Sequence, residues 1–157
     1  MYSNDLICNI LKYIDSHLIE KISVDDLCKE FHYNRFYIMK LFKKEMGVTI
    51  IYYINALRIF NSAMQIIQNK DIYFTKIALD NGFISLEYFS EIFKSIMHVN
   101  PKIFKNSLNR YNDLSLDITL IIHDRLIFLK KLINDKNKYL KMQRLVAYPV
   151  KKLSIFQ

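Results

Sequence analysis

The chain has 157 residues, of which 52% are hydrophobic, enough for one ordinary domain with a packed core or for two very small ones. It has only two glycines and two prolines, which favours long helices, and its two cysteines lack the CxxC spacing of a zinc site. No apolar run approaches the roughly 18 residues of a membrane span, and the first residues lack the basic region of a secretory signal, so we expect a cytoplasmic protein without membrane contact.

The formal net charge of +8 favours polyanionic partners, but this charge is unevenly distributed. Residues 1–48 hold seven basic and seven acidic residues, residues 49–110 hold seven and four, and residues 111–157 hold nine and four. The three parts therefore contribute zero, +3 and +5. Because most of the positive charge lies in the tail, evidence for nucleic-acid binding by the front part must come from local patterns.

Apolar periodicity and capping residues predict a series of helices in the front part of the chain. Ser23, Asn34, Thr49, Ser85 and Asn100 are good N-cap residues, each preceding an amphipathic segment. The predicted helices span 5–18, 23–31, 34–46, 50–67 and 74–81, then a segment from Ser85 through Ile96, and finally 100–108. The helix at 50–67 is the longest, and eighteen residues give it a length of about 27 Å.

The two halves of this region repeat each other. Gly82 separates a short helix from a longer amphipathic one, which is typical of a helix-turn-helix, and a looser copy lies about fifty residues upstream. The matched pairs are Ile22 and Ile72, Leu27 and Ile77, Cys28 and Ala78, and Tyr33 and Phe83 at an offset of 50, then Tyr37 and Tyr88, Phe42 and Phe93, Lys43 and Lys94, and Val48 and Val99 at an offset of 51. The sequence therefore predicts a duplicated helix-turn-helix joined by the helix at 50–67.

Residues 111–157 leave this pattern. The segment 116–122 alternates well enough for a strand, although Ile121 breaks the alternation, whereas 125–133 fits a helix better. Residues 136–144 are basic and are expected to be exposed. Three alternatives stay open for this tail: it packs on the front domain, it pairs with another chain, or it is the remnant of a longer effector region.

The motif residues of both halves resemble the AraC/XylS family of transcription activators. They are Ile22-Ser23, Leu27-Cys28, Tyr33-Asn34, Phe42-Lys43, Gly47, Tyr53-Ile54, Leu57-Arg58 and Ala63, then Ile77-Ala78, Gly82-Phe83, Tyr88-Phe89, Phe93-Lys94 and Pro101. The resemblance implies an all-α, seven-helix DNA-binding domain over 1–110, with 111–157 as a basic C-terminal extension. It also implies sequence-specific binding to double-stranded DNA, contact with RNA polymerase, and no cofactor.

The family pattern places DNA-facing residues on the first recognition helix, with Asn34 at its start. Those residues are Arg35, Phe36, Met39 and Lys40, followed one turn later by Lys43 and Lys44. Arginine and lysine reach guanine edges or phosphates, and apolar side chains contact thymine methyl groups. The alternative is that the helix at 34–46 has a charged face only because that face lies in solvent, which is the commoner reason for a run of charges.

The second recognition helix matches at Ser85, Leu86, Glu87, Tyr88, Glu91 and Lys94. Here the sequence departs from the family, because Glu91 stands where arginine is usual. A carboxylate near phosphates is repelled unless it accepts a hydrogen bond from cytosine. This helix either makes selective cytosine contacts or adds little affinity, and we favour the second interpretation.

Helix N-termini at Ser23, Thr49 and Asn100, together with Lys102, are the expected phosphate contacts. Two further departures from the family concern the first unit: Cys28 is expected to be a small buried residue, and His32 replaces the usual turn glycine and should adopt a strained or altered turn.

Two other functions compete with DNA binding. The histidines are scattered and no catalytic or phosphate-cradling motif is present, so an enzyme is disfavoured. The stronger rival is a degenerate family member that acts mainly as a protein-interaction module on polymerase or another regulator. The two recognition helices, which we call readers, lie on one chain and suffice for a DNA site with two halves. We therefore expect that a monomer can bind DNA. Dimerisation through the tail is left open.

Overall fold

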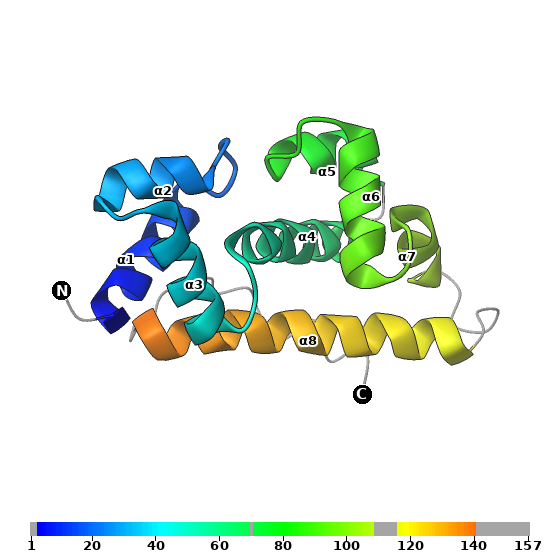
Figure 1. Cartoon of the computed structure of the whole chain (residues 1–157). Coiled ribbons are helices and arrows are strands. Elements are labelled where there is room, and N and C mark those ends of the chain that lie inside the picture. The colour runs from blue at the N-terminus through cyan, green and yellow to red at the C-terminus, as the bar shows by residue number, and fades with distance from the viewer. Residues whose placement is uncertain (1–2, 70, 109–115, 141–157) are drawn as a thin grey trace.

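The computed structural model describes residues 3–69, 71–108 and 116–140, and every regular element in these ranges is a helix (Figure 1). The helices are α1 (Ser3–Ser16), α2 (Val24–Phe31), α3 (Arg35–Met46), α4 (Ile50–Gln68), α5 (Phe74–Asp80), α6 (Leu86–Met97), α7 (Pro101–Ser107) and α8 (Leu116–Leu140). The predicted all-α fold is confirmed, and the seven helices expected over the front part are α1 to α7.

The predicted N-caps are confirmed by their hydrogen bonds. The side chains of Ser23, Asn34, Thr49, Ser85 and Asn100 each accept a hydrogen bond from the backbone N–H three residues further on. Local sequence thus defines the start of five helices.

The turns between helices use left-handed backbone conformations. Gly47 and Gly82 have φ values of 75° and 77°, as glycine readily does. His32 has a φ of 58°, which confirms the strained turn predicted there, and His98 ends α6 with a φ of 62°. By the offsets of the repeat, His32 matches Gly82 and His98 matches Gly47, so each left-handed turn has glycine in one half and histidine in the other.

Helix α4 runs between two three-helix groups, with α1, α2 and α3 on one side and α5, α6 and α7 on the other (Figure 1). All residues from Tyr53 to Phe60 on α4 are buried. On the first side the ring of Phe42 packs edge-on against Tyr53, and on the second the rings of Phe89, Phe93 and Phe104 form a continuous edge-to-face series. The long helix is therefore the shared core of both groups.

The tail forms one continuous helix, α8, over 116–140. The strand considered for 116–122 is wrong, because these residues form the first turns of α8. The apolar residues of α8 follow a helical period, and the buried ones lie on one face: Ile122, Leu126, Leu129 and Leu132. A lone strand would also have no partner in the described part of this helical fold.

Helix α8 lies along both groups and contacts α1, α3, α4 and α6 (Figure 1, yellow to orange). Arg125 anchors it: Nε donates to the main-chain oxygen of Ile96 at 2.6 Å, and Nη2 donates to the Tyr52 hydroxyl at 3.2 Å. Of the three alternatives for the tail, packing on the front part is confirmed for residues 116–140. The predicted exposure of the basic stretch 136–144 stays a prediction, because the side chains of 136–140 and the whole of 141–144 lie outside the described part of the chain.

Candidate nucleic-acid interface

Helix α3 has one buried and one exposed face. Ile38, Leu41, Phe42 and Met46 pack into the core, which leaves the opposite side chains in solvent. Phe36 is 74% exposed and Met39 is 42% exposed, although both are large and apolar. These two residues and Arg35, Lys40 and Lys43 recur at intervals of three or four, so the structure brings the first five predicted contacts onto one outward face. Lys44 is also exposed, and its ammonium lies 3.9 Å from Glu45.

The charged groups on this face of α3 interact only weakly with other parts of the protein. Arg35 Nη1 lies 2.7 Å from Asp25 Oδ1, but both side chains are more than half exposed. An ion pair so exposed to water contributes little free energy and is easily exchanged for a phosphate. Lys40 lies over the ring of Phe36, with Nζ 5.7 Å from the ring centroid. A mixed apolar and cationic surface of this kind suits both base edges and the backbone of DNA.

A hollow of about 310 Å³ adjoins this face and joins α3 to the start of α4. It is lined by Val24, Phe36, Met39, Lys40, Lys43, Thr49, Ile50 and Ile51. The sequence did not single out Val24, Ile50 or Ile51 as part of the site, since only the tertiary fold brings the start of α4 beside α3. The 47% exposure of Ile51 extends the apolar surface of the reader beyond its own helix.

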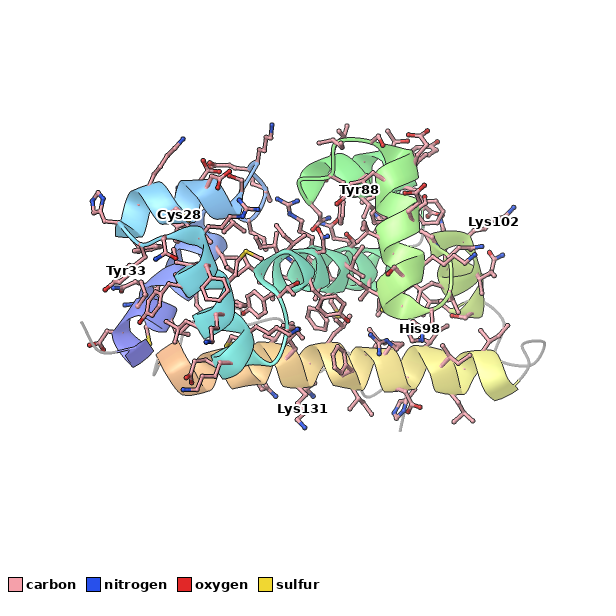
Figure 2. All side chains as sticks on the ribbon, viewed as in Figure 1. Cys28, Tyr33, Tyr88, His98, Lys102 and Lys131 are labelled. Atoms are coloured by element: carbon pink, nitrogen blue, oxygen red, sulfur yellow. The ribbon has the colours of Figure 1, made fainter. Side chains whose placement is uncertain are left out.

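Helix α6 presents a different surface at the equivalent positions. Ser85, Leu86 and Tyr88 are half-buried, and the Ser85 side chain accepts the hydrogen bond that caps the helix. The Tyr88 ring lies 6.1 Å from that of Phe83, in the space between α5 and α6 (Figure 2). These three predicted DNA contacts are therefore partly used in capping and packing α6. The exposed residues among the predicted contacts on this helix are Glu87, Glu91 and Lys94.

The two readers carry opposite charge. Helix α3 has four basic residues and one acidic residue, a net +3, whereas α6 has one basic residue and two acidic ones, a net −1. At the repeat offset of 51, Glu91 stands where α3 has Lys40, and Glu87 where α3 has Phe36. In the described part of the chain neither glutamate forms an ion pair, so both carboxylates face solvent uncompensated.

The three predicted phosphate-binding helix ends differ in what already occupies them. At Ser23, the backbone N–H and the hydroxyl both donate to Asp26 Oδ2, at 2.8 and 2.6 Å, so a carboxylate already holds the position of an anion. Thr49 begins the nineteen-residue α4, which has no acidic residue in its first turn. Asn100 begins the short α7, with exposed Lys102 beside it (Figure 2). The macrodipole and free N–H groups make the Thr49 end the most suitable of the three.

A buried arginine ties the two halves together behind the readers. Arg58 on α4 is 8% exposed and donates from Nε to the Leu18 oxygen at 2.8 Å and from Nη2 to the Glu20 oxygen at 2.7 Å. Its guanidinium also lies over the ring of Phe83 in the second turn, 5.9 Å from the centroid. Burial lowers the pKa of Arg58 from its usual value. The sequence showed Arg58 only as a motif residue, and the structure shows that it connects the loop after α1 with the second helix-turn-helix.

Other kinds of site find no support within the described ranges. Among residues 3–69, 71–108 and 116–140, no helix has the length and hydropathy of a membrane span, and no cluster of three potential metal ligands occurs. Cys8 and Cys28 are both half-buried and form no disulfide with each other, so Cys28 is less buried than the sequence predicted.

Comparison with known proteins gives consistent matches. Residues 27–107 match a family described as a helix-turn-helix domain. The chain is 29% identical to the HTH-type transcriptional activator AarP of Providencia stuartii, over 73% of this chain and 84% of AarP. It is 30% identical to the transposon Tn10 TetD protein of Escherichia coli, over 68% of this chain and 76% of TetD.

A solved structure matches the fold as well. The crystal structure of an AraC-type DNA-binding domain-containing transcriptional regulator from Chromobacterium violaceum aligns with a TM-score of 0.57 and 23% identity, over 70% of this chain and 97% of that one. Some relatives are much longer, and the chain spans 37% and 32% of the length of two of them.

Proposed function

The chain belongs to the AraC-type helix-turn-helix transcriptional regulators, and on this premise we propose that α3 supplies most of its affinity for duplex DNA. Membership places the protein among DNA-binding regulators and not among enzymes. The observation that carries the proposal is the contrast between the outward faces of α3 and α6, +3 against −1, at equivalent positions of the repeat.

In this proposal the outward face of α3 enters a major groove. Arg35 and Lys40 contact guanine or phosphate, Phe36 and Met39 contact thymine methyl groups, and Lys43 and Lys44 contact the backbone. The N-terminus of α4 at Thr49 holds a phosphate beside the same groove. The exposed apolar side chains support this role, because they would otherwise lie in water without a partner.

Helix α6 would enter the next major groove along the same face of the duplex. Successive grooves lie about 34 Å apart, and α4, with nineteen residues at about 1.5 Å each, separates the two readers by a comparable distance. Glu87 and Glu91 then accept hydrogen bonds from cytosine or repel the backbone, so this contact adds selectivity more than affinity. A modest bend in the DNA would let both readers reach their grooves.

At the level of the whole protein, we propose a cytoplasmic activator that contacts RNA polymerase from its DNA site. The printed name of AarP, an activator over most of whose length this chain aligns, supports this direction of regulation. Residues 1–110 form the DNA-binding domain in this proposal, and 111–157 form an extension whose helix α8 braces it.

Salt dependence tests the central claim. Preferred duplexes would be selected from a random pool, and their affinity measured by fluorescence anisotropy between about 50 and 200 mM salt. With four or five phosphate contacts, log K should fall against log salt with a slope of about −4. A slope near zero, or no selected duplex, would contradict DNA binding.

The second candidate function is a protein-interaction module on polymerase or another regulator, favoured by the uncompensated Glu87 and Glu91. Such a module would still bind its protein partner when the α3 face is neutralised. An Arg35→Ala and Lys40→Ala double variant therefore separates the two functions: loss of regulation in cells supports DNA reading by α3, and retained regulation supports the interaction module.

A further inference from the structure

The outward face of α8 carries exposed apolar side chains, although the Arg125 guanidinium lies over the ring of Phe128, 4.6 Å from its centroid. Leu120 and Ile127 are 51% and 52% exposed, and Ile121 and Phe128 are 37% and 36% exposed. They recur at an interval of seven along the helix: Leu120 and Ile127 lie opposite the buried row that begins with Ile122, and Ile121 and Phe128 lie on the flank of that row. We name the stripe formed by these four residues, with Asp124 and Lys131 between and beside them, the α8 outer stripe. Helix α8 is thus apolar on two faces, which is typical of a helix with a partner on each side.

The outer stripe also carries two exposed charges of opposite sign. Asp124 is 79% exposed at its side chain, and its Oδ1 lies 3.8 Å from Nδ1 of the neighbouring His123. The side chain of Lys131 is exposed and points away from the body of the protein (Figure 2). Asp124 and Lys131 are one heptad apart, on the same line of the helix surface as Leu120 and Ile127.

From these features we infer that the α8 outer stripe pairs with the same stripe of a second copy, with the two helices antiparallel. A two-fold axis between Ile127 and Phe128 places each of these residues against the other in the partner. The same axis places Asp124 of each copy against Lys131 of the other, which forms two equivalent ion pairs around a central apolar cluster. The stem of Lys131 can also cover part of Leu120.

Charge selects this arrangement over other pairings of the same stripe. In a parallel pair, Asp124 would face Asp124 and Lys131 would face Lys131. In an antiparallel pair centred on Asp124, the apolar residues would overlap more fully, but the two aspartates would meet at the axis. Like charges placed directly opposite are unfavourable, and only the staggered antiparallel register replaces them with opposite charges.

The contact is short, so the association should be weak when the protein is free. Stable interfaces bury about 1,200 Å² or more in total, and one pair of two-turn stripes buries less, so we expect a Kd in the range of about 10–100 µM. Two copies bound at neighbouring DNA sites would associate more completely, because DNA raises their effective concentration. The inference concerns self-association and goes beyond the proposed function, since it holds whether or not α3 reads DNA.

Sedimentation velocity of the full chain without DNA, from about 5 to 300 µM, tests the inference. The wild type should shift from monomer to dimer over this range. Asp124→Lys and Lys131→Asp should each raise the Kd by about tenfold, because each creates two like-charge contacts. The double variant Asp124→Lys with Lys131→Asp should restore the wild-type Kd, since it exchanges the charges and keeps the pairing.

Matched controls make the result specific to α8. Lys21→Asp changes charge by the same amount at an exposed position in the loop before α2, outside every proposed contact, and should leave the Kd unchanged. Circular dichroism and thermal unfolding would verify that each variant folds. A wild type that stays monomeric at every concentration would overturn the inference, as would a dimer that the single reversals leave intact or that the double variant fails to restore.

Discussion

Gly82 lies directly against the main chain of Ile19: a Cβ atom at residue 82 would stand 2.7 Å from the Ile19 oxygen. The contact joins the turn of the second helix-turn-helix to the loop after α1, 63 residues earlier in the chain. Arg58 donates hydrogen bonds to the same loop and lies over Phe83. On another side of α4, α8 contacts α1, α3 and α6. The two units are therefore held together by more than the linker helix, and their readers keep a defined relative position.

Gly82→Ala should destabilise the protein much more than Gly47→Ala. Both glycines have φ values near +75°, so both substitutions incur the cost of a left-handed alanine, about 1–2 kcal/mol. Only at Gly82 would the new methyl meet backbone atoms, because nothing lies within 4 Å of a Cβ at Gly47. We expect a loss of about 3 kcal/mol or more at Gly82, measured by urea unfolding. Equal losses would show that Ile19 and Gly82 do not pack closely in solution.

Arg125→Ala should lower the free energy of unfolding by about 1–3 kcal/mol, because it removes donors to the Ile96 oxygen and the Tyr52 hydroxyl and leaves the buried carbonyl of Ile96 to find other partners. Thr119→Ala, at an exposed position of the same helix, is the matched control and should change stability by less than about 0.5 kcal/mol. Amide exchange on α8 provides the second measurement. Protection that stays the same in Arg125→Ala would contradict the anchoring role.

Lys40→Ala should weaken specific DNA binding by about tenfold, whereas Glu91→Ala should leave it unchanged or slightly tighten it. The two residues occupy equivalent positions of the repeat, so the comparison isolates the charge of each reader. Affinities would be measured on one selected duplex at fixed salt. If the two variants lose affinity equally, the readers contribute equally and the proposed asymmetry is wrong.

Asp26→Asn should lower the free energy of unfolding at neutral pH and make it less sensitive to acid. Hydrogen bonds from the hydroxyl and backbone N–H of Ser23 lower the pKa of Asp26 below its usual 3.8. A carboxylate whose pKa is lowered in the folded state stabilises the fold above its unfolded pKa, and this contribution is lost as the pH falls through the folded pKa.

The melting temperature of the wild type should therefore exceed that of Asp26→Asn at pH 7, and the two should converge towards pH 3. Glu91→Gln is the control, because it removes an exposed carboxylate in the middle of a helix. Its melting temperature should stay close to that of the wild type at both pH values. If the melting temperatures of wild type and Asp26→Asn differ by the same amount at all pH values, the stabilising effect of the Ser23 hydrogen bonds does not depend on the ionisation of Asp26.

What the sequence determined by itself is local or repetitive. The five N-caps and the stops at Gly47 and Gly82 follow from residues three or fewer positions away, so they could be predicted without tertiary information. The duplication showed that α3 and α6 are equivalent, and the residue types at matching positions showed their opposite charge. The strain at His32 was predicted in the same way, from the absence of glycine where a left-handed turn was needed.

Only the tertiary structure decided what depends on contacts between distant residues. Residues 116–122 fit both a strand and a helix by local pattern, and the helix results because its apolar row can be buried against α1, α3, α4 and α6. The hollow beside α3, the role of Arg58 and the approach of Gly82 to Ile19 each join segments far apart in sequence. No local periodicity records such contacts, since they depend on how helices pack and not on where helices begin or end.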